Sequence, residues 1–234
     1  MVVTAAGTVV SYVVAWLVSV PALVPLLNAA LPWWLMVSAL RAGDTRRAVA
    51  IMLVWATTMG VVSTGMAAAG ASRTRRGGDL FLRAAYRDQM LDWVRTGVGP
   101  ESDPAQFVPR HAGYAAAFGG LSLATGGALS MPMGAVLMNQ MGEYVGAMAA
   151  RSANPLTSAV LGWHPWALMR VAGFVMMGVV LSGVVLSRWL RFPFSLSAER
   201  RWVAVGGALL VLDVALKWAL APAWGALLKG VAGW

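Results

Sequence analysis

Long apolar stretches separated by short basic segments dominate the pattern of this 234-residue chain. A helix needs about 20 apolar residues to cross the roughly 30 Å hydrocarbon core of a bilayer. Several stretches reach that length, and the polar turn at 41–47 separates two of them. We therefore predict an all-α fold, a single membrane domain in which the helices form a bundle. The expected spans cover residues 5–27, 48–71, 111–138, 165–187 and 202–220.

Proline and tryptophan modify the first apolar stretch, residues 2–40. It is slightly too short for two comfortable crossings, so we expect one span followed by a short interfacial helix. Pro21 and Pro25 are expected to kink the span, which a membrane helix tolerates when neighbours satisfy the freed carbonyl groups. Pro32 and the two tryptophans after it predict a stop at the level of the lipid headgroups.

The polar connector 73–110 lies between the second and third predicted spans. Within it, residues 79–95 carry apolar side chains at helical spacing, and the segment 97–104 has the composition of a turn. We predict an amphipathic helix that lies in the bilayer interface or packs on the bundle. The apolar stripe of this helix consists of Leu82, Tyr86, Met90 and Trp93.

Two further segments extend the predicted spans. Residues 139–150 follow the third span and contain a cluster of polar side chains. We expect them to form a helical extension or a re-entrant piece. The tail 222–234 begins with a proline and ends with a tryptophan, and we expect it at the interface.

Composition supports a membrane protein, because 59% of the residues are hydrophobic and only 12% are charged. A soluble domain is nearer 45–50% apolar and 25% charged. The formal charge of +9 comes mostly from Lys and Arg between the apolar runs. We therefore expect contact with the lipid bilayer rather than with nucleic acid. The basic residues predict the cytoplasmic (inner) membrane with a cytoplasmic N-terminus, because loops 73–110 and 188–201 then share the cytoplasmic side.

Enzymatic and cofactor motifs are missing from the sequence. It contains no Cys, which excludes disulfides, thiolate metal sites and Cys nucleophiles. It also has no HExxH, GxSxG, P-loop or dinucleotide-binding glycine pattern. We expect neither a metal nor another cofactor, and we expect no enzymatic activity.

Glycine recurs at a period that suits close helix packing. Such a stripe lets another backbone approach one helix face. The contact is either internal to the bundle or a seam for a second copy or a protein partner. The candidate packing residues are Gly113, Gly120, Gly127 and Gly134, with Gly142 and Gly146 forming a GxxxG pair.

Polar residues inside apolar blocks are the candidates for a substrate or proton pathway. Asn139, Gln140 and Glu143 form the densest such patch, which lies either at the interface or around a polar cavity. Asp213 and Lys217 are four residues apart in the last span, so they share a helix face. They predict either a self-neutralising pair or pairs across helices.

The cross-helix alternative gives Asp213 or Lys217 a partner in Glu143 or Arg170. Arg170 could instead snorkel to the headgroups. Near it, Trp163, His164 and Trp166 are expected to form an interfacial helix start, although His164 could also titrate or bind a metal.

The block 134–181 resembles the membrane core of the stage II sporulation protein M type. Asn139, Gly142 and Gly146 match its glycine-rich span, and His164 matches a histidine at the head of the next helix. In this chain the proline follows that histidine, and a leucine replaces the family's glutamate. The resemblance implies a membrane component that works with envelope or transport machinery.

Three functions compete on these grounds. The first is a non-catalytic membrane subunit or scaffold of an envelope or transport complex. The second is a self-contained small-molecule or proton-coupled transporter, and the third is an intramembrane enzyme that uses His164 or His111. Convergence of the buried charges in one polar cavity would favour the transporter. The charges in question are Glu143, Arg170, Asp213 and Lys217.

Overall fold

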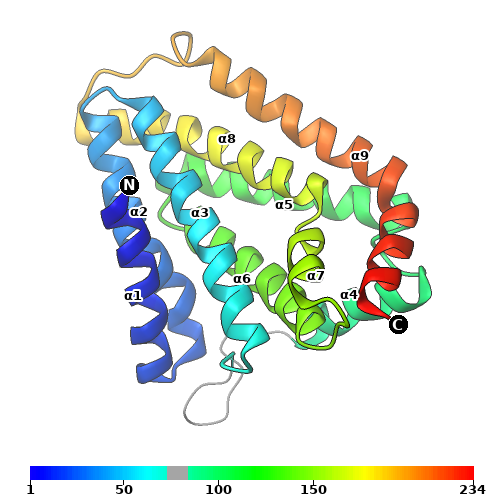
Figure 1. Cartoon of the computed structure of the whole chain (residues 1–234). Helices are drawn as coiled ribbons and strands as arrows, with labels where there is room; N and C mark the ends of the chain where they lie inside the picture. The colour runs from blue at the N-terminus through cyan, green and yellow to red at the C-terminus, as the bar shows by residue number, and fades with distance from the viewer. Residues whose placement is uncertain (73–83) are drawn as a thin grey trace.

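The computed structural model describes residues 1–72 and 84–234. The regular secondary structure of this part of the chain is helical, without strands, which confirms the predicted all-α class (Figure 1). A short 3-10 turn, Pro21–Leu23, lies between the first two helices. The helices are α1 (Val2–Val18), α2 (Val24–Arg41), α3 (Thr45–Ala68), α4 (Ala84–Thr96), α5 (Pro104–Thr125), α6 (Ser130–Ala149), α7 (Pro155–Gly162), α8 (Pro165–Leu190) and α9 (Arg200–Ala232).

Four helical segments of the described chain are long and apolar enough to cross a membrane. They are Pro21–Arg41, Thr45–Ala68, Pro165–Leu190 and Arg200–Ala232. Large apolar side chains also lie on the protein surface, and both Val211 and Trp218 on α9 are 71% exposed. A surface of this kind is unfavourable in water and suits hydrocarbon. The fold is therefore that of an all-α membrane bundle.

Helix α6 lies at the centre of the arrangement. All of its residues from 138 to 149 are buried. Its most extensive packing is against α3, while α8 packs mainly on α9 and α5. In Figure 1, α1, α2 and α3 form one side of the molecule, and α5, α8 and α9 run across the other. The buried charges Asp213 and Lys217 lie on α9 in this second group, whereas the buried Glu143 lies on α6.

The first predicted span is wrong in its boundaries, because residues 5–27 form parts of two helices. Helix α1 ends at Val18, and the next residue, Ser19, has a left-handed φ of 57°. Pro21 and Pro25 each begin a helical segment instead of kinking one. Pro32, the expected stop, lies inside α2. The physical reason is that proline needs no N–H partner in the first turn of a helix, so it starts helices readily.

The third predicted span, 111–138, is also wrong, because the chain turns between α5 and α6. Gly126 and Gly127 have φ values of 58° and 87°, which glycine adopts without the strain of a Cβ atom. The turn is attached to α2, since the Trp33 indole N–H donates to the carbonyl of Gly126 at 2.9 Å. Residues 139–149 then continue α6 as a helix, and the choice between a helical extension and a re-entrant piece stays a prediction.

The position of the tail 222–234 at the membrane interface stays a prediction. Helix α9 continues beyond the predicted span 202–220, through Pro222 as far as Ala232. The reason is packing, because Leu228 and Ala232 are buried in this segment. The adjacent helices α4 and α7 both contact α9.

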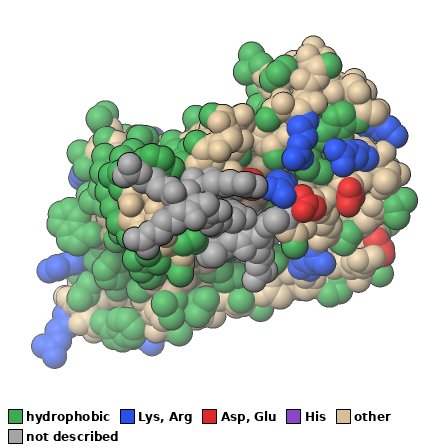
Figure 2. Space-filling view, turned by 90° about the horizontal axis from the view of Figure 1, so that it is seen from below, with side chains coloured by type: hydrophobic (Ala, Val, Ile, Leu, Met, Phe, Trp, Pro, Cys, Tyr) green, Lys and Arg blue, Asp and Glu red, His purple; other side chains and the backbone are tan. Residues whose placement is uncertain are grey.

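Helix α4 is the described part of the predicted amphipathic helix, and Leu82 lies outside the described residues. Met90 and Trp93 are buried, and α4 packs against α6 and α9. A position of α4 in the bilayer interface stays a prediction. Seen from below in Figure 2, the visible acidic side chains lie on the right, basic side chains lie both there and at the left edge, and apolar side chains cover much of the left part of the face.

Candidate functional site

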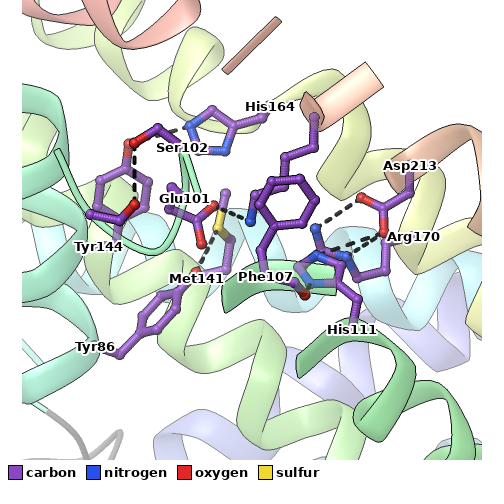
Figure 3. A network of polar contacts seen from close by, with 12 residues as sticks. Tyr86, Glu101, Ser102, Phe107, His111, Met141, Tyr144, His164, Arg170 and Asp213 are labelled. Atoms are coloured by element: carbon purple, nitrogen blue, oxygen red, sulfur yellow. Dashed lines mark hydrogen bonds and ion pairs between the residues drawn. The ribbon is translucent and has the colours of Figure 1, made fainter. Parts of the chain in front are cut away.

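A two-contact ion pair joins α8 to α9 inside the bundle. Arg170 donates from Nε to Asp213 Oδ2 at 2.8 Å and from Nη2 to Oδ1 at 2.9 Å. Only 3% of the Asp213 side chain is exposed. A paired geometry of this kind is the strongest arrangement that arginine and a carboxylate form. Figure 3 shows the two side chains pointing toward each other.

A second buried ion pair lies one helical turn further along α9. The Lys217 ammonium is 2.7 Å from Glu101 Oε2, and the Lys217 side chain is 0% exposed. The same nitrogen lies 4.7 Å from the centre of the Phe107 ring, a cation–π distance. Glu101 belongs to the turn before α5. Asp213 and Lys217 therefore each form an ion pair with another element. The predicted cross-helix alternative is observed for Asp213, whose partner is Arg170, whereas the partner of Lys217 is Glu101.

His111 on α5 lies beside both pairs. Its Nδ1 is 2.7 Å from the carbonyl oxygen of Phe107, so Nδ1 carries the proton when the ring is neutral. Its Nε2 is 3.9 Å from Asp213 Oδ2 and has no hydrogen-bond partner among the described residues. Within residues 1–72 and 84–234, no three His, Cys, Asp or Glu residues are placed to hold a metal ion.

A cavity of about 130 Å³ opens beside these charges. Its polar wall is formed by Glu101, Arg110, His111, Gln140 and Arg170. Six aromatic residues contribute to the rest of the wall, so the space combines charge with flat apolar surfaces. They are Trp55, Tyr86, Tyr114, Phe118, Trp163 and Phe174.

Tyr86 contributes its phenol to the cavity from α4. The Tyr86 hydroxyl donates to the sulfur of Met141 at 3.7 Å. Burial, together with the nearby Glu101 carboxylate, raises the pKa of Tyr86. The phenol therefore stays a neutral hydrogen-bond donor at physiological pH.

A second hollow, of about 450 Å³, lies between α5, α8 and α9. Its wall is mainly apolar and includes Ala112, Val214 and Trp218. Polar groups enter it from His111, Arg170 and Asp213. We call it the lateral groove, because exposed residues of α9 form one of its sides.

The predicted pathway residues do not all gather at this site. Arg170, Asp213 and Lys217 lie in the two linked ion pairs, and Gln140 lines the cavity. Glu143 is buried in α6, and its Oε1 is 3.4 Å from Arg87 Nη1 on α4.

Arg87 also donates to Asp88 at 2.8 Å. This hydrogen bond, together with the charges of Asp88 and Glu143, outweighs the effect of burial and raises the pKa of Arg87. Arg87 is therefore a permanent cation beside Glu143, and this pair shares no residue with the Arg170–Asp213 and Lys217–Glu101 pairs.

Asn139 belongs to a separate polar network between the first helices and α6. It accepts a hydrogen bond from the Tyr12 hydroxyl, and its Nδ2 donates to Asn28 Oδ1 at 3.2 Å. Asn28 in turn donates from Nδ2 to Ser11 Oγ at 2.7 Å. Its carbonyl oxygen accepts from the Trp55 indole N–H at 2.8 Å. Because all these groups are buried, Asn139 attaches α1 and α2 to the centre of the bundle.

The predicted packing glycines fall into different environments. A Cβ added at Gly146 would lie 2.4 Å from the carbonyl oxygen of Thr64, and one at Gly142 would lie 1.8 Å from Ser63 Oγ. These two positions therefore bring α6 against α3. At Gly113 and Gly120 an added Cβ would have no neighbour within 4 Å in the described part of the chain. Gly127 lies in the turn and Gly134 faces Phe118, so the seven-residue repeat does not form a single seam.

The expected interfacial residues lie against other parts of the protein. His164 and Trp166 are each 1% exposed, and their rings stack with centroids 4.7 Å apart. The Tyr144 hydroxyl is 3.4 Å from His164 Nε2. Trp163 donates from its indole N–H to Thr64 Oγ1 at 3.2 Å. Contact of His164 or Trp166 with lipid headgroups would require exposure that this arrangement does not provide.

Sequence reasoning missed the partners that complete the site. Glu101 was part of a segment recognised only by its turn composition, and nothing local links it to Lys217. Asn28 was a single amide in an apolar stretch, which was the available signal of a buried hydrogen-bond network. His111 was considered for an enzyme and not as a neighbour of Asp213.

Comparisons with protein-family models, with curated proteins and with solved structures give no match. The resemblance to the stage II sporulation protein M type therefore stays a prediction.

Proposed function

We propose that this protein is a membrane transporter for a small molecule and that the cavity beside Arg170 is its binding site. The observation that carries the proposal is the convergence of Arg170, Asp213, Lys217 and Glu101. Charged groups at membrane depth are costly and are retained where they face a partner or a pathway. Arg170 and Glu101 meet both conditions, because each forms an ion pair and each also lines the cavity.

The two ion pairs can change partners without leaving a charge isolated. Asp213 binds Arg170 directly, has His111 3.9 Å away, and has Lys217 one helical turn along α9. A bound ion can therefore compete with one partner while another compensates. Exchange of this kind between α8 and α9 would couple ligand binding to a movement of these helices.

A scaffold is the second candidate, and its support is the open face of α5. Gly113 and Gly120 leave space for the backbone of another helix. The other glycine pair supports a scaffold less, because Gly142 and Gly146 are already covered by α3.

The transporter and the scaffold can be distinguished without knowing the substrate, by measuring whether a reagent reaches the cavity from both sides of the membrane. The natural chain has no Cys, so single cysteines can be labelled without background. We would place Cys at Gln140 or Ala167, which line the cavity. A membrane-impermeant methanethiosulfonate would then be added to right-side-out and inside-out vesicles.

A transporter predicts labelling of both cysteines from both sides. Ala135→Cys, a buried position outside the cavity wall, should stay unlabelled. Arg151→Cys, an exposed position, should be labelled from one side. Labelling of the cavity positions from one side only, or from neither, would overturn the transporter proposal.

A further inference from the structure

We infer that the bound molecule is a single-chain amphiphile from the bilayer with a carboxylate headgroup. Its chain would occupy the lateral groove, and its headgroup would reach the cavity beside Arg110. This inference rests on the proposed function, because it names the class of molecule that the same site binds.

The lateral groove suits an alkyl chain. Its wall is formed mainly by Val, Ala, Leu, Phe and Trp side chains from α5, α8 and α9. Val108 and Trp218 on this wall are 41% and 71% exposed. If this exposed side faces hydrocarbon, a chain can enter from the bilayer without crossing water. Burial of such a chain needs only apolar contact, which the groove supplies.

The groove and the cavity meet at the same side chains. His111, Arg170 and Phe174 contribute to the walls of both. A molecule whose chain lies in the groove therefore has its end next to the polar wall of the cavity. The cavity, at about 130 Å³, has room for a small headgroup.

The charge of the cavity wall favours an anion. Asp213 and Glu101 are compensated by Arg170 and Lys217. Arg110 also lines the cavity, and it forms no ion pair within the described chain. Arg110 is thus a cation without an acidic partner in the described chain, and a ligand with one negative charge would balance it. A carboxylate fits this balance, and guanidinium groups bind carboxylates in a favourable planar geometry.

Gln140 provides a second and independent indication of a ligand. Its side chain lines the cavity although the residue is only 7% exposed. No hydrogen bond to another described residue occupies its amide. Buried polar groups in folded proteins are almost always hydrogen-bonded. The amide can donate to a carboxylate oxygen that Arg110 also binds.

The test measures binding of 12-bromododecanoate to the full chain in phosphatidylcholine nanodiscs. Quenching of tryptophan fluorescence reports the bromine, because Trp218 lies on the groove wall. Dodecanoate should displace the probe, and dodecyltrimethylammonium, with a chain of equal length and opposite charge, should not. Displacement by both compounds equally would show that the groove accepts any alkyl chain and would overturn the headgroup assignment.

Variants locate the two ends of the molecule. Arg110→Gln and Gln140→Leu should each weaken binding about tenfold, the effect of losing one good polar contact. Ala112→Trp or Val214→Trp, from opposite walls, should fill the groove and weaken binding about tenfold or more. Arg200→Gln and Val205→Trp, placed outside both hollows, should change it by less than about twofold. Each variant is first checked by its thermal unfolding.

Binding of the folded groove variants at the wild-type affinity would overturn the placement of the chain. Binding of Arg110→Gln at the wild-type affinity would overturn the placement of the headgroup. These failures differ from failure of the transporter proposal. The cysteines at Gln140 and Ala167 would still be labelled from both sides if the site transports a different class of molecule.

Discussion

Arg170 on α8 and Asp213 on α9 are joined by two hydrogen bonds of 2.8 and 2.9 Å, and this contact ties the two longest helices of the described chain to each other at a buried point. Removing one partner leaves the other charge uncompensated. We expect Asp213→Asn to lower the free energy of unfolding by about 3–5 kcal/mol. Thermal or denaturant unfolding in mild detergent measures this loss.

The double variant Arg170→Met, Asp213→Leu is the matched control for that prediction. It removes both charges and keeps side-chain volume, so we expect it to recover most of the lost stability. A double variant no more stable than Asp213→Asn would show that the ion pair does not account for the loss.

The Lys217–Glu101 pair predicts a measurable coupling energy. A double-mutant cycle with Lys217→Met and Glu101→Gln should give an interaction of about 1–3 kcal/mol, because the two groups are buried and 2.7 Å apart. The same cycle on Arg95 and Asp92, an exposed pair at 3.9 Å, should give about 0–1 kcal/mol. Equal coupling in the two cycles would contradict the buried pair.

Gly146 and Gly113 predict opposite effects of the same substitution. In Gly146→Ala the added Cβ would lie 2.5 Å from the Ala67 Cβ and even closer to backbone of α3. We expect a loss of about 1–3 kcal/mol from overpacking. Gly113→Ala meets nothing within 4 Å, so the higher helix propensity of alanine should stabilise by up to about 1 kcal/mol. Thermal unfolding of the two variants in one detergent decides the signs.

The adjacent residues Asn139 and Gln140 are expected to have different roles. The Asn139 amide joins helices through hydrogen bonds, and the Gln140 amide lines the cavity and is proposed to bind the ligand. Asn139→Leu removes the partner of Tyr12 and Asn28 and should destabilise the protein by about 1–3 kcal/mol. Gln140→Leu breaks no hydrogen bond within the described chain, so its stability should stay within about 0.5 kcal/mol of wild type. Unfolding of both variants tests this, and a larger loss in Gln140→Leu would contradict the assignment.

Local patterns predicted the elements well where chemistry is local. The predicted span 48–71 agrees with α3 (Thr45–Ala68) to within three residues at each end, and α3 begins after Asp44, whose carboxylate accepts the N–H of Arg47 at 2.8 Å. The span that starts at Pro165 agrees with α8 at its first residue. The predicted boundaries were wrong at Pro21, which begins a helical segment instead of kinking one, and at Gly126, where the chain turns. Packing selected among these outcomes.

The sequence by itself determined that this is a helical membrane protein, because apolar length and scarce charge are properties of the chain and not of its folding. It also singled out Arg170, Asp213 and Lys217, since charges in apolar helices need an explanation wherever they lie. Only the tertiary structure decided their partners. Glu101 is 116 residues from Lys217, and an ion pair over that separation forms when helix packing brings the two groups together. For the same reason, Asn139 and Gln140 are adjacent in sequence yet one joins the helices and the other faces the cavity.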